Sequence, residues 1–369
     1  MRISVPTIPH ALSAPSTATK PIDTREAIDR IARFLAPGNV TLVTGAGVSV
    51  DSGIRAYRGS NGRYLNPNYK PIFYHELMDR TDKGAAYRLR SYLGYKSVRD
   101  SQPNTTHFAL AALQYKSIIP RLITQNVDGL HHKSMQQIWN KAQMENGILE
   151  LHGSLHKVHC THGHVVDRNV FQDWLSSANP RWKAFADALE ASGQGPRTNP
   201  DGDVVLEGVS YDDFVVPDCP VCLQEGRKNN VQKPELIFFG ESIQSRVKDL
   251  SYQHIDTCDR LFLVGTTLAT FSAFRYTHRE AGSGVHYLLI SVESDRLLKH
   301  ALELQKPVLM LNIGPTRADG LPGMEKIEIA SGIVMRDVVR QVLGFESISD
   351  TVVNEMLRSG VVQPPREDD

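Results

Sequence analysis

The chain contains five short runs in which almost every residue is apolar, and longer stretches of mixed polarity separate them. These runs cover residues 40–44, 118–124, 236–239, 261–264 and 308–313. A strand that is apolar on both of its alternating faces must be covered on both sides, which is typical of a parallel sheet between two layers of helices. The pattern therefore predicts the α/β class, with a Rossmann-like, doubly wound parallel sheet.

Residues 150–234 break this pattern and predict a second, smaller lobe inserted into the sheet domain. The segment is rich in His, Asp, Pro, Gly and Asn, and it holds three of the four cysteines. We therefore expect the sheet domain to consist of residues 25–149 and 235–345. Residues 1–24 would form a leader, and residues 346–369 a C-terminal tail that is frayed over its last ten residues.

A long interruption separates two pieces that would otherwise join into one amphipathic helix. The pieces are residues 270–275 and 297–304, and residues 276–296 lie between them. Two origins of this insertion stay open, a translated retained intron and a genuine loop specific to this class of protein. In either case we expect the insertion to protrude as a loop.

The charges of the chain cancel, since 41 Lys and Arg residues stand against 41 Asp and Glu residues. A protein that binds nucleic acid or an anionic membrane nonspecifically would need a basic surplus. No apolar run reaches the roughly 18 residues of a membrane-spanning helix. We therefore expect a protein that binds neither nucleic acid nor a membrane directly.

The first 20 residues contain Arg2, Lys20 and many Ser and Thr residues, but no acidic residue. This composition is typical of a mitochondrial transit peptide. A disordered tail fits the composition equally well, and the prolines of the segment oppose a good amphipathic helix.

A glycine loop, residues 44–59, follows the first apolar run directly. Gly45 and Gly47 lack a Cβ, so a phosphate could approach the backbone there, and we expect the loop to lead into a helix whose N-terminus faces the anion. The spacing is G-x-G-x5-G rather than G-x-G-x-x-G, and no acidic residue for a ribose hydroxyl lies about 20 residues further on. An ordinary dehydrogenase fingerprint therefore does not fit.

Three further clusters of polar or small residues also stand at or near the ends of apolar runs. They are residues 124–131, which contain Gln125, Asn126 and Asp128, residues 150–153 around His152, and residues 265–267. Because the carboxyl ends of parallel strands meet at one edge of a sheet, we expect these clusters to form one ligand site.

In this order the four motifs resemble the sirtuins, the NAD-dependent lysine deacylases of the silent information regulator family. The resemblance extends from about residue 28 to residue 342. Residues 200–204, 216–219 and 311–317 are similar to the class II, mitochondrial sirtuin 4 type. The resemblance implies a monomeric enzyme of the mitochondrial matrix that transfers acyl groups from protein lysines to ADP-ribose and releases nicotinamide.

The resemblance also implies roles for individual residues. His152 would be the general base that takes a proton from a ribose hydroxyl, and Asn126 and Asp128 would act beside it. NAD would be bound by Gly45, Ala46, Gly47, Ser49, Gly53, Tyr57, Arg58, Gln125, Asn126, Asp128, Gly265, Thr266, Thr267, Asn312, Gly314 and Ser331. The loop departs from the family at Arg55 and Ala56, where the family has Pro and Asp, which puts loop order and turnover in question.

Two segments resemble parts of the family that bind the acyl-lysine substrate. Phe238, Phe239, Gly240 and Glu241 would lie on an edge that pairs with the substrate backbone by strand addition. Tyr87 and Arg90 resemble the Tyr-x-x-Arg pair that holds a carboxylate-ended acyl chain in some mitochondrial sirtuins. The alternative for Arg90 is an ordinary exposed helical face.

Cys160, Cys219 and Cys222 suggest a structural Zn²⁺ site, because Cys219-Pro-Val-Cys222 has the spacing of a zinc knuckle. The second C-x-x-C of the family is incomplete, and either His162 or His164 would supply the fourth ligand. An empty relic and a disulfide remain alternatives. The fourth cysteine, at position 258, is expected to be a small core residue.

Two other functions remain open beside the deacylase. A mono-ADP-ribosyltransferase would use the same pocket but transfer the ADP-ribosyl group to a protein side chain. A binding module for NAD or ADP-ribose would keep the pocket without catalysis, and the altered glycine loop and the incomplete zinc knuckle favour it slightly.

Overall fold

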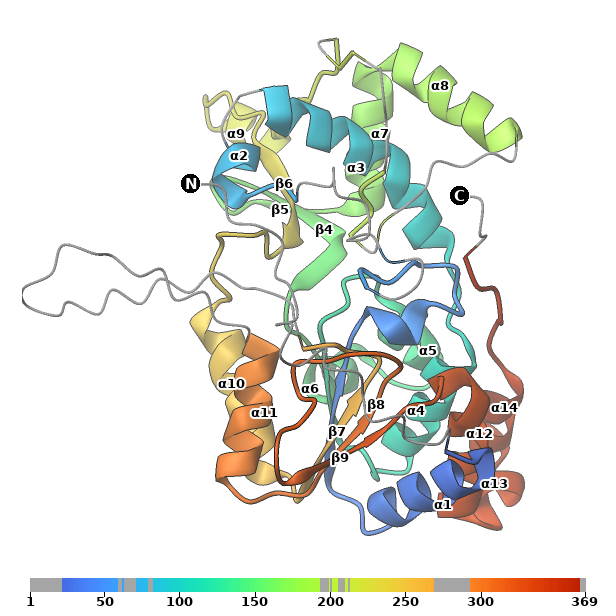
Figure 1. The fold of residues 1–369 in the computed structure, drawn as a ribbon. Helices are drawn as coiled ribbons and strands as arrows, with labels where there is room; N and C mark the ends of the chain where they lie inside the picture. Colours follow the sequence, from blue (N-terminus) through green and yellow to red (C-terminus); the bar gives the residue numbers. More distant parts are fainter. Residues whose placement is uncertain are drawn as a thin grey trace, which may run out of the picture.

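Two sheets of different kinds organise the chain, a parallel sheet in the larger lobe and an antiparallel sheet in the smaller lobe (Figure 1). The computed structural model describes residues 22–58, 62, 71–78, 82–192, 199, 201–204, 210–211, 213–268 and 293–365. The predicted insertion therefore lies mostly outside the described residues, as does most of the leader. Within the described part, Asp23 caps the first helix, α1 (Thr24–Leu35), and its Oδ2 accepts from the backbone N–H of Arg25 at 3.0 Å.

The parallel sheet has six described strands in the order β3-β2-β1-β7-β8-β9. Their bounds are β1 Val40–Thr44, β2 Arg121–Thr124, β3 Ile148–Glu150, β7 Arg260–Val264, β8 Val308–Leu311 and β9 Met324–Ile327. All neighbouring strands of this sheet run parallel. The chain winds outward from β1 to β3 and then returns to β7 on the other side of β1. The predicted doubly wound sheet is confirmed, and its switch point lies between β1 and β7.

Helices cover both faces of the parallel sheet (Figure 1). On one face α1, α4 (Thr105–Tyr115), α12 (Ser331–Leu343) and α14 (Thr351–Arg358) share a buried apolar core with β1. On the other face α10 (Ser245–Thr257) and α11 (Glu293–Glu303) pack against β7 and β8. Short helices α5 (Leu130–Met135), α6 (Lys141–Gly147) and α13 (Glu346–Ser349) complete this lobe.

The smaller lobe is built on a three-stranded antiparallel sheet in the order β5-β4-β6. Its strands are β4 Gly153–Cys160, β5 Val165–Asp167 and β6 Gln232–Leu236, and its helices are α7 Arg168–Ala178, α8 Pro180–Ala191 and α9 Pro220–Gln224. Two earlier helices, α2 (Tyr74–Met78) and α3 (Asp82–Asp100), also lie on this lobe (Figure 1). Leu89 and Leu93 of α3 share a core with Val158 and Phe171, so residues outside 150–234 contribute to it. The domain boundaries themselves stay a prediction.

One predicted strand of the parallel sheet is wrong. The apolar run 236–239 was expected there, but β6 ends at Leu236 and pairs antiparallel with β4 in the other sheet. The run that follows leaves the small sheet and passes along the cavity described below. Two short strands at the sheet edges, β3 and β9, were not predicted, because β3 has only three residues and two of the four residues of β9 (Met-Glu-Lys-Ile) are charged.

The expectation of a frayed C-terminal end is wrong for the residues that the structure describes. After α14, the backbone N–H of Val361 donates to Pro103 O at 3.1 Å, and that of Gln363 donates to Asp51 O at 2.7 Å. The second bond reaches the ligand cavity described below, because Asp51 lines it. None of the helices in the described part of the chain is long and apolar enough to cross a membrane.

Candidate active site

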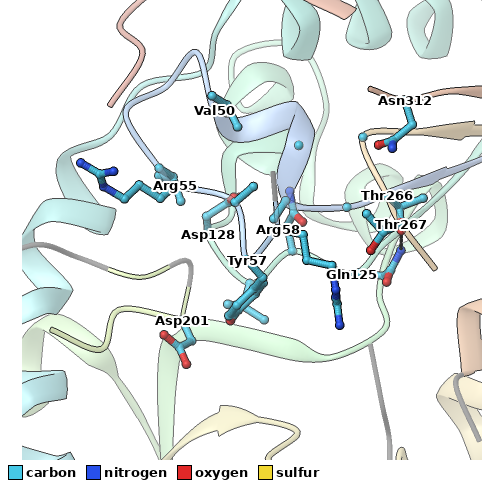
Figure 2. Close-up of a pocket in the computed structure, with 18 of the residues that line it drawn as sticks. Val50, Arg55, Tyr57, Arg58, Gln125, Asp128, Asp201, Thr266, Thr267 and Asn312 are labelled. Atoms are coloured by element: carbon cyan, nitrogen blue, oxygen red, sulfur yellow. Dashed lines mark hydrogen bonds between the residues drawn. The ribbon is translucent and has the colours of Figure 1, made fainter. Parts of the chain in front are cut away.

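A cavity of about 720 Å³ lies at the carboxyl edge of the parallel sheet, where the two lobes meet. Figure 2 shows Gln125, Thr266 and Asn312 gathered on one side of it, and Tyr57 and Asp201 on another. Of the predicted residues, the lining includes Gly45, Ala46, Gly47, Tyr57, Arg58, Tyr87, Gln125, Asn126, Asp128, His152, Phe238, Phe239, Gly265, Thr266, Thr267, Asn312, Gly314 and Ser331. The four motifs thus converge on one site.

Five predicted site residues lie outside the lining, namely Ser49, Gly53, Arg90, Gly240 and Glu241. The sequence reasoning also missed lining residues, among them Asp51, Gly332, Pro364 and Pro365. Asp201 and Asp203, which also line the cavity, were noticed only as part of a family-like segment. Single residues of this kind carry no motif that could have revealed them in one sequence.

The glycine loop is packed directly against the loop that follows β7. A Cβ added at Gly45 would lie 2.8 Å from the carbonyl oxygen of Gly265, and one at Gly47 would lie 2.8 Å from the Gly265 Cα. The backbone N–H of Gly47 also donates to Gly265 O at 2.9 Å. These glycines are therefore required by the contact between the two loops, whatever ligand they also face.

In the part of the glycine loop that the structure describes, residues 44–58, the expected helix does not form. The loop contains a single 3₁₀ turn, η2 (Ala46–Ser49), and α2 begins only at Tyr74. Ser49 is not a helix cap either, because its hydroxyl donates to Asp128 Oδ2 at 2.8 Å. The loop is thus held by the second motif rather than by a helix of its own.

The polar side chains of the second motif are fixed by buried hydrogen bonds. Asn126 Nδ2 donates to Ser49 Oγ at 3.1 Å, and Asp128 Oδ1 accepts from the backbone N–H of Leu130 at 2.9 Å. Gln125 Nε2 donates to Thr266 Oγ1 at 2.8 Å, which connects the ends of β2 and β7. Because each side chain is bonded to another motif, their orientation toward the cavity is set before a ligand arrives.

His152 follows β3 and lines the same cavity. Its Nδ1 lies 3.1 Å from the carbonyl oxygen of Gln125. A carbonyl only accepts, so Nδ1 carries the proton and Nε2 of the neutral ring keeps its lone pair. Burial lowers the pKa of His152 to about 4, an effect that the hydrogen bond to Gln125 partly opposes. His152 is therefore neutral near pH 7 and can accept a proton.

The pair Tyr87 and Arg90 does not face the cavity as a unit. Tyr87 lines the cavity, and its buried hydroxyl has no hydrogen-bond partner in the described structure. Arg90 Nε donates to Asp203 Oδ1 at 2.7 Å, and Asp203 is 5% exposed. The guanidinium is thus already engaged by a carboxylate of the chain itself.

The segment 237–241 forms one wall of the cavity and is held on both sides. The backbone N–H of Ile237 donates to His152 O at 3.0 Å, and Phe239 O accepts from the backbone N–H of Tyr74 at 2.8 Å. Glu241 faces the other way, since its carboxylate binds Lys233 Nζ at 2.8 Å. Phe238 and Phe239 therefore present side chains to the cavity, while Glu241 holds the turn in place.

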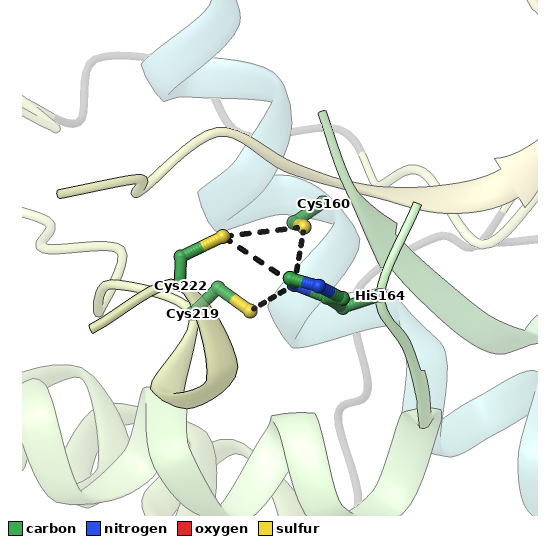
Figure 3. Close-up of side chains that lie close together, drawn as sticks. All are labelled: Cys160, His164, Cys219 and Cys222. Carbon is green, nitrogen blue, oxygen red and sulfur yellow. Dashed lines mark hydrogen bonds between the residues drawn. The ribbon is translucent and has the colours of Figure 1, made fainter. Parts of the chain in front are cut away.

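A second group of chemical interest lies in the smaller lobe. Cys160, His164, Cys219 and Cys222 point toward one another (Figure 3), and their ligand atoms all lie within 4.8 Å of each other. His164 Nδ1 lies 3.5, 3.6 and 3.4 Å from the sulfur atoms of Cys160, Cys219 and Cys222. The sulfur atoms of Cys160 and Cys222 are 3.8 Å apart.

These separations match a tetrahedral zinc site. With Zn–S near 2.3 Å and Zn–N near 2.0 Å, tetrahedral geometry places two sulfurs about 3.8 Å apart and sulfur and nitrogen about 3.5 Å apart. His164 is the better fourth ligand, because its Nδ1 lies close to all three sulfur atoms. His162 Nδ1 lies 3.5 Å from the sulfur of Cys222 and accepts a hydrogen bond from Asn229 Nδ2 at 3.0 Å. Glu225 lies 3.7 Å from His164 Nε2 and can orient the ring. The four residues can hold a structural Zn²⁺, and the cysteines are not paired as disulfides.

Comparison with known proteins agrees with this arrangement. A profile of the Sir2 family matches residues 45–272. The chain is 36% identical over 307 residues to the NAD-dependent protein deacylase SIR4 of Batrachochytrium dendrobatidis, covering 82% of this chain and 89% of that protein. It is 34% identical over 281 residues to an NAD-dependent protein deacetylase of Xanthomonas axonopodis pv. citri, covering 76% of this chain and 80% of the relative.

The fold is also similar to that of solved structures. A crystal structure of a Sir2 homolog in complex with NAD superposes with a TM-score of 0.53 at 20% identity, covering 85% of this chain and 93% of that one. The structural likeness concerns the fold, whereas the sequence matches to the relatives cover most of the chain. The chain belongs to the Sir2 family, the sirtuins.

Proposed function

We propose that the protein is an NAD-dependent protein-lysine deacylase. The observation that carries this proposal is the placement of His152, a partly buried neutral base, in one cavity with the fixed side chains of Gln125, Asn126 and Asp128. The relatives named above are NAD-dependent deacylases and deacetylases, which supports the same activity.

The residues that line the cavity suit an extended dinucleotide. The backbone of the glycine loop and the loop at Gly265 would hold the phosphates, and Asn312 at the end of β8 would reach the adenosine ribose. Gln125, Asn126 and Asp128 would bind the nicotinamide end through amide and carboxylate groups. NAD supplies the ADP-ribosyl group that accepts the acyl chain, with nicotinamide as leaving group.

The overall reaction converts acyl-lysine, NAD and water into free lysine, nicotinamide and O-acyl-ADP-ribose. The bonds that break join nicotinamide to C1′ of its ribose and the acyl carbon to the lysine nitrogen. The acyl oxygen forms a new bond to C1′, a ribose hydroxyl forms the ester bond to the acyl carbon, and water supplies the second oxygen of the ester and a proton to the leaving lysine amine. His152 Nε2 would take the proton of the attacking ribose hydroxyl. Phe238 and Phe239 would flank the acyl-lysine side chain on its way into the cavity.

The test is nicotinamide release from NAD with acetyl-, succinyl-, methylglutaryl- and lipoyl-lysine peptides, each offered separately. We expect release with at least one peptide and a loss of about 10²-fold or more in His152→Ala, which lacks the base. His300→Ala is the matched control, since His300 pairs with Asp256 at the surface and lies outside the cavity. Equal rates in wild type and His152→Ala would contradict the proposal.

Mono-ADP-ribosyl transfer and simple binding remain the alternative outcomes. Mass spectrometry of the peptide separates the first, because a deacylase leaves a lighter peptide and a transferase leaves one that carries ADP-ribose. NAD binding without nicotinamide release from any peptide would favour the binding module. The glycine loop at Arg55 and Ala56 would then be the first region to restore by mutation.

We also propose that the protein works in the mitochondrial matrix, because residues 1–20 of its leader contain Arg2 and no acidic residue. Residues 1–24 fused to a fluorescent protein should direct it to mitochondria, and the same fusion with Arg2 and Lys20 replaced by Glu should not. A cytosolic distribution of the first fusion would contradict this localisation.

A further inference from the structure

The end of the chain lies along the glycine loop and pairs with it. We call residues 360–365 the C-terminal strap. Within it, Val361 forms a parallel bridge with Asn104, and Gln363 forms a parallel bridge with Ser52. The backbone N–H groups of Val361 and Gln363 donate to Pro103 O at 3.1 Å and to Asp51 O at 2.7 Å. Alternate strap residues thus bind two separate loops, as a short strand would.

Both partners of the strap belong to the wall of the NAD cavity or support it. Asp51 lines the cavity, and Asn104 Nδ2 donates to the carbonyl oxygen of Val48 in the glycine loop at 2.7 Å. Pro364 and Pro365 line the cavity themselves. The strap is therefore both a support of the glycine loop and a part of the cavity wall.

The start of the strap is fixed in position. Arg336 Nη2 of α12 donates to Ser359 O at 2.8 Å. Gly360 has φ +103, and a Cβ there would lie 2.5 Å from the backbone nitrogen of Thr105. Only glycine permits this close approach, so the path of the strap is built into the packing against α4. The two prolines then stiffen its end.

The part of the glycine loop that the strap binds has little other support from secondary structure. Residues 51–58 contain no helix, and their only bridge is the one between Ser52 and Gln363. Gly53 adopts φ +84 and faces the strap, because a Cβ there would lie 3.6 Å from Gln363 O. The bond from Gln363 to Asp51 therefore restrains a segment that leads directly into the cavity-lining residues Ile54 to Arg58.

From these contacts we infer that the C-terminal strap is a positioning element of the NAD site, which holds residues 51–53 in the conformation that receives the dinucleotide. This inference rests on the proposed NAD-dependent function. We expect its loss to weaken NAD binding more than peptide binding, because the backbone hydrogen bonds of residues 361 and 363 hold the glycine loop and its neighbour, residues 103–104.

The experiment compares the full chain with two truncations, one ending at Ser359 and one ending at Pro365. Calorimetry with ADP-ribose measures binding, and steady-state nicotinamide release measures the KM for NAD and for an acyl peptide. We expect the chain ending at Ser359 to bind ADP-ribose about tenfold more weakly and to show a similar rise in the KM for NAD, equal to about 1.4 kcal/mol. The chain ending at Pro365 keeps the strap and should behave as the full chain.

A point variant tests the backbone bond alone. Gln363→Pro removes the N–H that binds Asp51, whereas Gln363→Ala keeps it. The proline variant should raise the KM for NAD several-fold, and the alanine variant should fall closer to wild type. An unchanged affinity for ADP-ribose in the chain ending at Ser359 would overturn the inference.

The outcomes also separate this inference from the proposed function. If the full chain binds ADP-ribose but releases no nicotinamide, the deacylase proposal fails while the binding comparison still decides the role of the strap. If the truncation raises both KM values equally and lowers the melting temperature, the strap is only a stabilising segment. Failure of the full chain to bind ADP-ribose would overturn both.

Discussion

At the scale of single residues, two carboxylates of the cavity wall, those of Asp201 and Asp203, act on Arg90. The carboxylate of Asp203 engages Arg90 at 2.7 Å, and Asp201 lies on the same wall. Burial lowers the pKa of the Arg90 guanidinium, and the charge and hydrogen bond of Asp203 raise it. The net effect is a raised pKa. A terminal carboxylate on the acyl chain would have to compete with Asp203 for the same guanidinium.

We therefore predict that Asp203→Asn changes acyl preference. It removes one negative charge and releases Arg90, so the ratio of kcat/KM for succinyl- or methylglutaryl-lysine to that for acetyl-lysine should rise roughly tenfold. Asp213→Asn, which alters an exposed pair with Arg181, serves as the control. An unchanged or lower ratio would show that Arg90 does not meet the acyl chain.

Many site residues could be predicted because they follow apolar strands directly. Gln125 and Asp128 stand just after β2. The carboxyl ends of parallel strands lie at one edge of the sheet, so residues that follow these strands come close together. The bond between Arg90 and Asp203 could not be predicted, since it joins residues 113 positions apart in the sequence. The geometry of this bond depends on how α3 packs on the smaller lobe, and no local sequence pattern predicts that packing.

At the scale of elements, the metal group connects three pieces of the smaller lobe. Cys160 ends β4, His164 lies in the turn to β5, and Cys219 and Cys222 stand at the start of α9. Among the described residues, the cluster of buried side chains at this position consists of the three cysteines. A bound Zn²⁺ would therefore supply much of the local stability.

We predict that His164→Ala loses most of its zinc while His162→Ala retains it. The purified proteins can be compared by elemental analysis for zinc and by thermal unfolding, and only His164→Ala should melt at a lower temperature than wild type. The reason is geometric, since His164 Nδ1 lies within 3.6 Å of all three sulfur atoms. Loss of zinc in His162→Ala alone would reverse the assignment, which the sequence had left open.

The elements of the larger lobe were predicted more completely than those of the smaller one. β1 coincides with the first apolar run, and the bounds of β7 and β8 differ by at most two residues from those of their apolar runs. The agreement arises because strands that are buried on both faces are apolar throughout. β6 differs in that its sequence, Gln-Lys-Pro-Glu-Leu, is mostly polar. Its position comes from pairing with β4 and from the bond between Lys233 and Glu241, both of which are tertiary contacts.

At the scale of the whole molecule, the fold buries several histidines in the neutral form. Burial lowers the pKa of His107, His152 and His254 to about 4, and it also lowers the pKa of His131 well below its usual range. Between pH 6.5 and 4 the unfolded chain binds protons at these groups and the folded chain does not. Stability contributed by these groups is therefore present above the unfolded pKa and is lost as the pH falls.

One buried acid works in the opposite direction. Burial, with the charge of Asp128, raises the pKa of Glu150 to about 8, so the folded chain holds a proton there that the unfolded chain has released above about pH 4.5. Acidification from pH 8 to 4.5 thus favours the folded state at this one position. Below pH 6.5 the destabilising contribution of the four histidines is larger than the stabilising contribution of Glu150. The net effect of acidification is therefore a loss of stability.

We predict that unfolding near pH 5.5 takes up about three protons per chain and that the melting temperature falls steadily from pH 6.5 to pH 4.5. Calorimetry in buffers of different ionisation enthalpy measures the uptake directly. His254→Gln should reduce the uptake by nearly one proton, because His254 lies outside the cavity and titrates in the same window. A melting temperature that rises on acidification through this range would mean that these histidines are charged in the folded protein, and His152 could then not act as the base.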